Sequence, residues 1–261
     1  MRLTLHRTIE LKVYHLNNGR ILPGLLVVHA NQPTIFGDAL VVGVSSTDDG
    51  NMRFDRGDDD ETRGNRIAFL EQLDIDPNQA TLVQVSYEDT TDFTRYRIVD
   101  DVNQGEGMLE PVSDLHADAL IVTRPDHAIF LPLADCIGAV IYDPTNQIMM
   151  VTHLGRHSVE MEGGIKSVQF LVDEFGSEPA DLQVWLSPAV GAENYPLFAF
   201  ENRSLTEVAC EQLLAAGVNV DRIEVSDIDT ATDDSYFSHS EYLAGNQMTD
   251  GRFAIVAMMR D

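Results

Sequence analysis

The sequence predicts a mixed α/β fold, because many short strand-like segments are interspersed with only a few helical ones. The strand-like segments are rich in Val, Ile and Leu and are bounded by Gly, Pro, Asn or Asp. They do not alternate regularly with helices, which indicates mixed rather than wholly parallel sheets. No repeat or low-complexity linker divides the 261 residues, so we expect a single domain over residues 1–261.

The N-terminal part of the chain combines short strands with one helix. An acidic loop is expected at Asp55–Glu61, and a helix at Asn65–Leu73, where apolar residues recur at helical spacing before Asp76-Pro77. The expected strands are Leu11–His15, Leu25–His29, Ala39–Val44, Thr81–Val85 and Arg95–Val99.

The rest of the chain predicts closely spaced strands and two further helices. One helix is expected at Val159–Phe175, and another at Ser204–Ala216 with Ser204 as its N-cap and Gly217 as its stop. The expected strands are Ala119–Thr123, Ala128–Leu133, Ile137–Tyr142, Ile148–Thr152, Asp181–Leu186, Arg222–Val225 and Phe253–Met258.

The charge is strongly one-sided, with 17 Lys and Arg residues against 43 Asp and Glu residues and a net charge of −26. We therefore expect no nucleic-acid partner and no anionic membrane partner, because phosphate contacts need Lys and Arg. Only Lys12 and Lys166 are lysines, and acidic residues cluster in Asp55–Glu61 and Asp229–Asp234. Two explanations of this composition stay open: a protein surface adapted to high salt, or an acidic protein without such adaptation.

Cysteine and apolar content indicate a soluble, cytoplasmic protein. The two cysteines, Cys136 and Cys210, exclude a disulfide-rich secreted module. The segment Met1–Glu10 lacks the apolar core of a signal peptide. The apolar runs all stop well short of the roughly 20 residues that a membrane helix needs.

Cys136 is the first candidate for chemistry, because it follows a buried strand run and Asp135. A hairpin of Ile137–Tyr142 and Ile148–Thr152 would place Cys136 beside His153. Such a pair can bind zinc, or it can act as nucleophile and base with Asp135 as an orienting group. An inert buried cysteine and a surface histidine are the alternatives.

The loop after His153 is a candidate anion site. Gly155 and the strand end favour a loop over a helix that would present His153 and His157 as paired metal ligands. Backbone N–H groups at the start of the next helix, with Arg156 beside them, favour a phosphate or a developing oxyanion. Cys210 lies within a helix and suits a buried small side chain.

An ordered set of motifs resembles one known family. The central motifs are Ala117–Thr123, Ala134-Asp135-Cys136, Tyr142-Asp143-Pro144 and His153-x-Gly155. Further similarities lie at His29-Ala30, Gly57-Asp58-Asp59, Asn65-Arg66, Gln84-Val85, Ser187–Gly191, Tyr236-Phe237-Ser238 and Thr249–Arg252. Their order and spacing are similar to the family once called multicopper polyphenol oxidoreductase or laccase. That family is now described as purine nucleoside phosphorylase-like and includes the bacterial peptidoglycan editing factor.

The resemblance implies a layered sandwich of mixed β-sheets flanked by helices, with zinc held by a His–Cys–His set beside a pocket. It implies phosphorolysis of adenosine, inosine or guanosine, with adenosine deamination also attributed to the family. Expected partners are therefore a purine nucleoside and phosphate. Cys136 and His153 correspond to two zinc ligands, with Asp135 as a further catalytic candidate. Gly155, Arg156 and Ser238 are the substrate- or anion-binding candidates. Copper is less expected, because copper oxidase sites need more Cys and His.

The sequence also departs from the family pattern. The first zinc histidine corresponds to Ser86, a poor ligand, so a replacement would have to come from His116, His157 or His239. Ser240 and Glu241 replace an arginine pair, and a negative Glu241 is expected to oppose anion binding.

Three functions therefore stay open. The chain is a variant zinc enzyme acting on purine nucleosides, a diverged protein that binds a small ligand, or a metal-free thiol hydrolase using Cys136 and His153.

Overall fold

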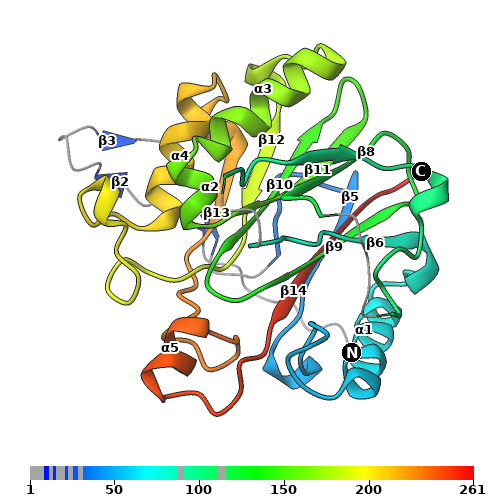
Figure 1. The fold of residues 1–261 in the computed structure, drawn as a ribbon. Helices are drawn as coiled ribbons and strands as arrows, with labels where there is room; N and C mark the ends of the chain where they lie inside the picture. Colours follow the sequence, from blue (N-terminus) through cyan, green and yellow to red (C-terminus); the bar gives the residue numbers. More distant parts are fainter. Residues whose placement is uncertain are drawn as a thin grey trace.

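Two β-sheets stacked face to face form the centre of the molecule, and helices cover both outer faces (Figure 1). The computed structural model describes residues 32–87, 91–110 and 116–261, together with the backbone of 9–11, 14–15, 21–22 and 26–28. This layered α/β sandwich of mixed sheets confirms the predicted fold class. In the described part of the chain, no helix has the length and apolar character of a membrane span.

The larger sheet has eight strands in the order β1-β4-β13-β12-β10-β11-β8-β7. They are β1 (Ile9–Leu11), β4 (Leu26–Val28), β7 (Tyr96–Ile98), β8 (Ala119–Val122), β10 (Ile137–Asp143), β11 (Ile148–Leu154), β12 (Gln183–Leu186) and β13 (Ile223–Ser226). Parallel pairs such as β12–β13 and antiparallel pairs such as β10–β11 occur side by side, so the sheet is mixed.

The smaller sheet has four strands in the order β5-β14-β9-β6. They are β5 (Leu40–Val44), β14 (Phe253–Met259), β9 (Ala128–Leu133) and β6 (Ala80–Leu82). A separate pair is formed by β2 (Tyr14–His15) and β3 (Ile21–Leu22). The C-terminal strand β14 therefore lies inside a sheet, between two strands from earlier in the chain.

Five α-helices are described, and their positions define the layers. They are α1 (Asp59–Gln72), α2 (Arg156–Glu160), α3 (Gly163–Phe175), α4 (Leu205–Ala215) and α5 (His239–Ala244). Helices α3 and α4 cover the larger sheet and α1 covers the smaller one, whereas α5 lies outside these layers, at one end of the sandwich (Figure 1).

Each sheet is apolar on both faces because each face packs against another layer. Along β10, Ala139 and Ile141 pack toward the helices, whereas Val140 packs between the two sheets. A third core cluster lies between the smaller sheet and α1, and it includes Phe69 and Leu70 of α1 and Phe130 of β9. These covered faces explain why the strands are apolar without alternation.

The predicted hairpin is confirmed by the pairing of β10 with β11. The register pairs Ile137 with Leu154 and Gly138 with His153, so Cys136 lies one residue beyond a strand end close to His153. Asp143 fixes the turn, because its carboxylate accepts the N–H groups of Thr145 and Asn146 at 2.8 and 3.0 Å.

Other boundaries needed correction. The acidic segment Asp55–Glu61 is not a loop throughout, because α1 already begins at Asp59. The Asp58 carboxylate accepts the Glu61 N–H at 3.0 Å as an N-cap, and acidic residues are favourable at the positive end of the helix dipole. The strand expected over Thr81–Val85 is shorter, since β6 ends at Leu82.

The helix expected over Val159–Phe175 is two helices. Helix α2 begins at Arg156. The helical conformation is interrupted at Glu162, which has a left-handed φ of 62° and immediately precedes α3. By contrast, α4 follows its predicted N-cap Ser204, and the Ser204–Glu207 capping box is complete.

Helix α5 was not predicted. Parts of the strands expected over Leu11–His15 and Leu25–His29, and the motif His29-Ala30, lie outside the described residues.

Candidate active site

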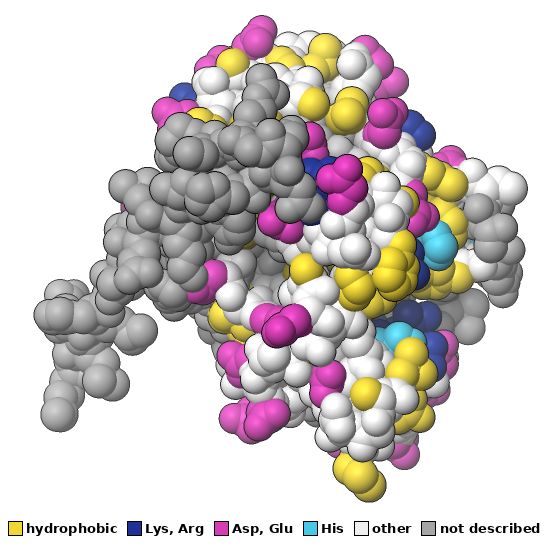
Figure 2. Space-filling model, turned by 90° about the vertical axis from the view of Figure 1, so that its left-hand side faces the viewer, with side chains coloured by type: hydrophobic (Ala, Val, Ile, Leu, Met, Phe, Trp, Pro, Cys, Tyr) yellow, Lys and Arg dark blue, Asp and Glu magenta, His cyan; other side chains and the backbone are white. Residues whose placement is uncertain are grey.

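A cavity of about 390 Å³ lies between the open end of the β10–β11 hairpin, the loop before α1 and helix α5. Figure 2 shows histidine and Lys or Arg side chains gathered around a hollow on one face of the molecule. The residues used below that line this cavity are Arg53, Arg56, Tyr87, Phe93, Asp135, Cys136, His153, Gly155, Arg156, His157, Tyr195, His239, Ser240 and Arg252. Five of the six predicted site residues are among them.

One side of the cavity, which we call the hairpin wall, consists of Cys136, His153 and Gly155. A Cβ atom placed on Gly155 would lie 2.9 Å from His153 Cε1 and 3.0 Å from Cys136 Sγ. Both side chains therefore converge on this glycine, and a larger residue there would displace them. The sequence spacing predicted that Cys136 and His153 lie close together, because strand pairing within a hairpin is local.

Burial keeps the hairpin wall neutral. Desolvation raises the pKa of the Cys136 thiol to about 12, with a further contribution from the Asp135 charge. Desolvation also lowers the pKa of His153 to about 4. Thiol and imidazole are thus both uncharged near pH 7, which disfavours a thiolate nucleophile.

Asp135 is held by hydrogen bonds from two other segments. Its Oδ2 accepts the Ser240 N–H at 2.7 Å and the Ser240 hydroxyl at 2.8 Å, and Thr230 Oγ1 donates to Oδ1 at 3.1 Å. Its backbone is in the left-handed region, with φ 74°. These contacts hold α5 against the end of β9, so Asp135 positions the part of the cavity lining that α5 supplies. Its catalytic role stays a prediction.

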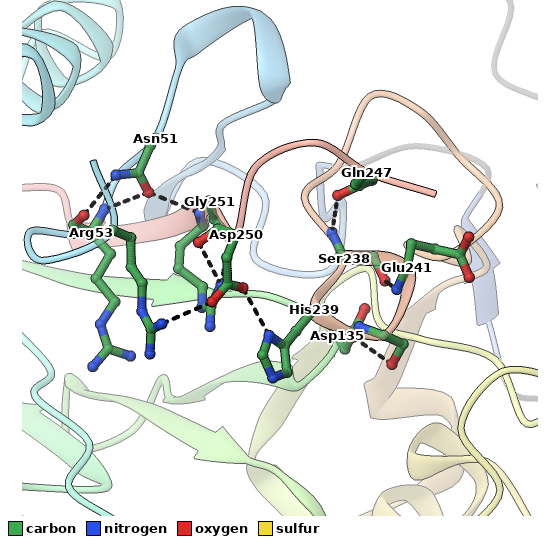
Figure 3. Close-up of polar contacts among 12 residues, drawn as sticks. Asn51, Arg53, Asp135, Ser238, His239, Glu241, Gln247, Asp250 and Gly251 are labelled. Carbon is green, nitrogen blue, oxygen red and sulfur yellow. Dashed lines mark hydrogen bonds and ion pairs between the residues drawn. The ribbon is translucent and has the colours of Figure 1, made fainter. Parts of the chain in front are cut away.

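The opposite side, which we call the arginine wall, consists of Arg53, Arg56 and Arg252. The Asn51 side chain links two of them, since Asn51 Oδ1 accepts the N–H groups of Arg53 at 3.1 Å and Arg252 at 3.0 Å (Figure 3). Asp250 links the other pair, because it accepts from Arg56 Nη1 at 2.9 Å and from Arg252 Nη1 at 2.7 Å. Two side chains therefore hold three cations side by side.

Positive charge on the arginine wall exceeds the negative charge that faces it. Desolvation lowers the pKa of Arg53, Asp55 opposes that shift at 3.4 Å, and the charges of Arg252 and Arg56 lower the pKa further. Burial raises the pKa of Asp250, but hydrogen bonds from Arg252 and His239 outweigh it and lower the pKa overall. Like charges held together in this way favour an anionic ligand.

Aromatic side chains line the remaining surface. The Phe93 ring is stacked on the ring of His157, with centroids 4.7 Å apart, and contacts Tyr87 at 5.8 Å. The Arg156 guanidinium lies 4.3 Å from the centroid of Tyr195, and its Nε has no hydrogen-bond partner among the described residues. These flat surfaces suit a planar ring.

Ser238 and Glu241 are placed differently from the sequence expectation. Ser238 is 1% exposed and does not line the cavity, and its hydroxyl accepts the Glu241 N–H as the N-cap of α5. The Glu241 carboxylate accepts from Asn246 and points away from His239 and the arginines (Figure 3). Glu241 does not line the cavity, and other segments supply the cations there, so its expected opposition to anion binding stays a prediction. An anion-binding role of Ser238 stays a prediction.

The donor set does not complete the zinc site that the family implies. Cys136 and His153 converge, but Ser86 occupies the position of the first ligand. Within the described residues, no group of three His, Cys, Asp or Glu side chains could hold a metal ion. His239 is bonded to Asp250, and His157 is stacked on Phe93. Zinc thus stays a prediction, and no step below depends on it.

Sequence reasoning missed most of the arginine wall. Arg53 and Arg56 stand three positions apart in an acidic segment, in a chain with 17 basic residues, and this was an available signal. Arg252 belongs to a motif that carries the resemblance, but its side chain had no assigned role. No local sequence pattern indicates the contact between Tyr195 and Arg156 or the contact between His239 and Asp250, because the two residues of each contact are well separated in the sequence.

Residues 41–199 match the family model described as multi-copper polyphenol oxidoreductase laccase. A curated relative from Bacteroides thetaiotaomicron, named purine nucleoside phosphorylase, is 21% identical over 218 residues, covering 74% of this chain and 77% of the relative. The hypothetical protein YfiH of Bacillus licheniformis shares the fold, with a TM-score of 0.77 and 19% identity over 91% of this chain and 97% of that one.

YlmD from Geobacillus stearothermophilus shares the fold equally well, with a TM-score of 0.77, 20% identity and the same coverage of 91% and 97%. The family match spans more than half of the sequence and includes the whole hairpin wall. The chain therefore belongs to the multi-copper polyphenol oxidoreductase laccase family, as a divergent member.

Proposed function

We propose that the chain is a purine nucleoside phosphorylase-like enzyme that cleaves a purine nucleoside with phosphate in the cavity described above. The observation that carries the proposal is the arginine wall. Four of the 17 basic residues of a chain with net charge −26 line this one cavity, counting Arg156. The named function of the Bacteroides relative supports the same relation at low identity.

The arginine wall is suited to a phosphate dianion. Guanidinium groups donate paired hydrogen bonds to phosphate oxygens, and a dianion relieves the mutual repulsion of Arg53, Arg56 and Arg252. The opposing charges, Asp55 and Asp250, leave the wall with net positive charge. Phosphate bound here needs no metal ion for its recognition.

The aromatic surfaces are suited to a purine. Tyr87, Phe93, His157 and Tyr195 line the cavity, and aromatic side chains make favourable contacts with a planar base. A volume of about 390 Å³ lies within the range that holds small ligands. Base and phosphate are thus accommodated on neighbouring surfaces of one cavity.

The reaction is a displacement at the anomeric carbon of the ribose. A phosphate oxygen forms a bond to C1′, the bond from C1′ to N9 breaks, and the electron pair leaves with the purine. The protein residues hold the two reactants in contact and stabilise the charge on phosphate, which accounts for a large part of such rate enhancements. Cys136 and His153 contribute a neutral surface beside the reacting groups.

The other two possibilities have less support. A thiol hydrolase needs a thiolate, whereas burial holds the Cys136 thiol neutral near pH 7. A ligand-binding protein without turnover would use the same arginine and aromatic surfaces, and only kinetics distinguishes it from an enzyme. Adenosine deamination has no specific contact in its favour.

The test is release of purine base and ribose 1-phosphate from adenosine, inosine and guanosine, with and without phosphate, at low and molar salt. Phosphate-dependent formation of both products is the expected result. Absence of products with every nucleoside, from protein shown to be folded, would leave the ligand-binding function instead.

Metal content of the purified protein, measured beside Cys136→Ala, tests the zinc prediction. Cys210→Ala is the matched control, because Cys210 lies on the buried face of α4, apart from the cavity. Zinc lost only in Cys136→Ala would support the predicted ligand. Protein that is active without zinc would refute a metal requirement.

A further inference from the structure

His239 and Asp250 form a hydrogen-bonded pair at the edge of the cavity (Figure 3). His239 Nδ1 lies 2.8 Å from Asp250 Oδ1, a distance typical of a charge-assisted hydrogen bond. Because a carboxylate only accepts, this contact places a proton on Nδ1 and leaves Nε2 as the nitrogen that exchanges protons with a ligand. Among the described residues, no group is bonded to Nε2.

The pair is held rigidly and shares its carboxylate with the arginine wall. Asp250 Oδ1 also accepts from Arg252 Nη1 at 2.7 Å, and Oδ2 accepts from Arg56 Nη1 at 2.9 Å. Its side chain is 11% exposed, whereas that of His239 is 43% exposed. A fixed carboxylate therefore orients a histidine that ligands can reach.

The charged and titratable groups around His239 come from several segments. The Asp250 carboxylate contacts His239, Arg56 and Arg252. The Tyr242 ring lies nearly parallel to the imidazole of His239, with ring centroids 6.4 Å apart. Asp135 accepts hydrogen bonds from Ser240, which is the residue that follows His239 in the sequence.

We propose that His239, oriented by Asp250, is the general acid that protonates the purine leaving group. The proposal rests on the proposed function and assigns it a residue that the zinc and thiol hypotheses do not use for proton transfer. Since one carboxylate joins His239 to two of the arginines, the proton donor is adjacent to the bound phosphate. A displacement at C1′ needs this arrangement, with nucleophile and leaving group in contact with the same carbon.

Hydrogen phosphate forms the new oxygen–C1′ bond, the C1′–N9 bond breaks, and its electron pair enters the purine ring. The imidazolium of His239 gives its Nε2 proton to purine N7 and becomes neutral, while the Nδ1–H bond to Asp250 remains. The ribose 1-phosphate formed carries the proton of hydrogen phosphate, and its release to solvent or to His239 restores the starting state.

The experiment compares inosine with 7-methylinosine, whose base is already cationic and needs no proton at N7. His239→Gln and Asp250→Asn are measured beside Glu241→Gln, a control on the same helix that lies outside the cavity. With inosine we expect kcat of His239→Gln to fall about 100-fold or more, the range of general acid catalysis. With 7-methylinosine we expect it to fall less than about threefold.

The pH profile gives a second readout. For inosine, kcat of the native enzyme should fall at high pH, where a general acid is lost, and His239→Gln should lack that limb. Equal losses with both nucleosides would show a merely structural role and overturn the proposal. A full rate with inosine in His239→Gln would overturn it as well.

A nitrogen-15 spectrum of the histidines separates this proposal from the proposed function, because it does not need turnover. We expect Nδ1 of His239 to be protonated, and its Nε2 resonance to shift when hypoxanthine is added. If the native protein releases no base, the proposed function fails, and a hypoxanthine-dependent Nε2 shift still supports the contact between His239 and the purine. No Nε2 shift overturns the assignment of His239.

Discussion

The two walls of the cavity are built in opposite ways. The hairpin wall comes from one continuous hairpin, is buried and is neutral near pH 7. The arginine wall comes from the loop after β5 and from the segment before β14, and it is charged. Backbone pairing holds the first wall together, whereas the side chains of Asn51 and Asp250 hold the second.

Under the proposed function, this difference separates two tasks within one site. A buried neutral surface excludes water and strengthens the electrostatic interactions near it. A fixed cationic surface recognises an anion and keeps its charge in place during the reaction. Substitutions in the hairpin wall should therefore affect turnover, and substitutions in the arginine wall should first affect phosphate binding.

Among substitutions in the hairpin wall and the arginine wall, the largest effect is expected from Gly155→Ala. Its Cβ would lie 2.9 Å from His153 and 3.0 Å from Cys136, so both side chains must move. We expect kcat/KM to fall about 100-fold, because displacements near 1 Å have costs of that order. The control is Gly64→Ala in α1, where nothing lies within 4 Å of the added Cβ. Similar activities of the two variants would contradict the tight convergence on Gly155.

The next effect is expected from Arg53→Gln in the arginine wall. Loss of a charge-assisted hydrogen bond costs about 1.5–3 kcal/mol, so the Kd for phosphate should rise roughly 10- to 100-fold. Calorimetry with inorganic phosphate measures this directly. Arg222→Gln removes one cation outside the cavity and should leave the Kd unchanged. An equal rise in both variants would point to net charge instead of a local site.

A smaller effect is expected from Asn51→Ala, which removes the link between Arg53 and Arg252. Each hydrogen bond contributes about 1 kcal/mol, so the phosphate Kd should rise about fivefold while the free energy of unfolding falls by about 1–2 kcal/mol. Asn246→Ala, which removes a contact of α5 outside the cavity, is the matched control. A normal phosphate Kd in Asn51→Ala would show that the arginines hold their places without this side chain.

The smallest effect is expected from His127, which belongs to neither wall. Burial lowers the pKa of His127, and Thr81 Oγ1 lies 2.7 Å from its Nε2. A folded-state pKa below the unfolded value contributes stability above the unfolded pKa, and that contribution is lost as pH falls below it. Denaturant unfolding from pH 7.5 to pH 5 should thus show a shallower pH dependence in His127→Gln, with phosphate binding at pH 7.5 unchanged. An unchanged slope would show that other groups cause the acid sensitivity.

Much of the hairpin wall was accessible from the sequence. Strand patterning and the Asp143 turn set the register of β10 and β11, and this register brings Cys136 close to His153. The motifs also placed Gly155 and Arg156 beside that pair. Hairpin geometry depends on nearby residues, so a local pattern was sufficient.

The arginine wall and the His239–Asp250 pair could not be found in this way. Arg53 and Arg252 meet because β14 inserts beside β5 in the smaller sheet, a pairing between distant parts of the chain. Helix α5 has six residues and is fixed by Ser238, Asp135 and Gln247, not by its own periodicity. The direction of the Glu241 side chain, away from His239, was not predicted either, since a residue's position in the sequence does not set it.

The sequence by itself determined the mixed α/β class, most strands, the Ser204 cap of α4 and the hairpin that carries Cys136 and His153, because these depend on periodicity and on contacts between near neighbours. Only the tertiary structure decided which charges face the cavity. That choice depends on long-range strand pairing and on shared hydrogen-bond acceptors such as Asn51 and Asp250, whose partners lie far away along the chain.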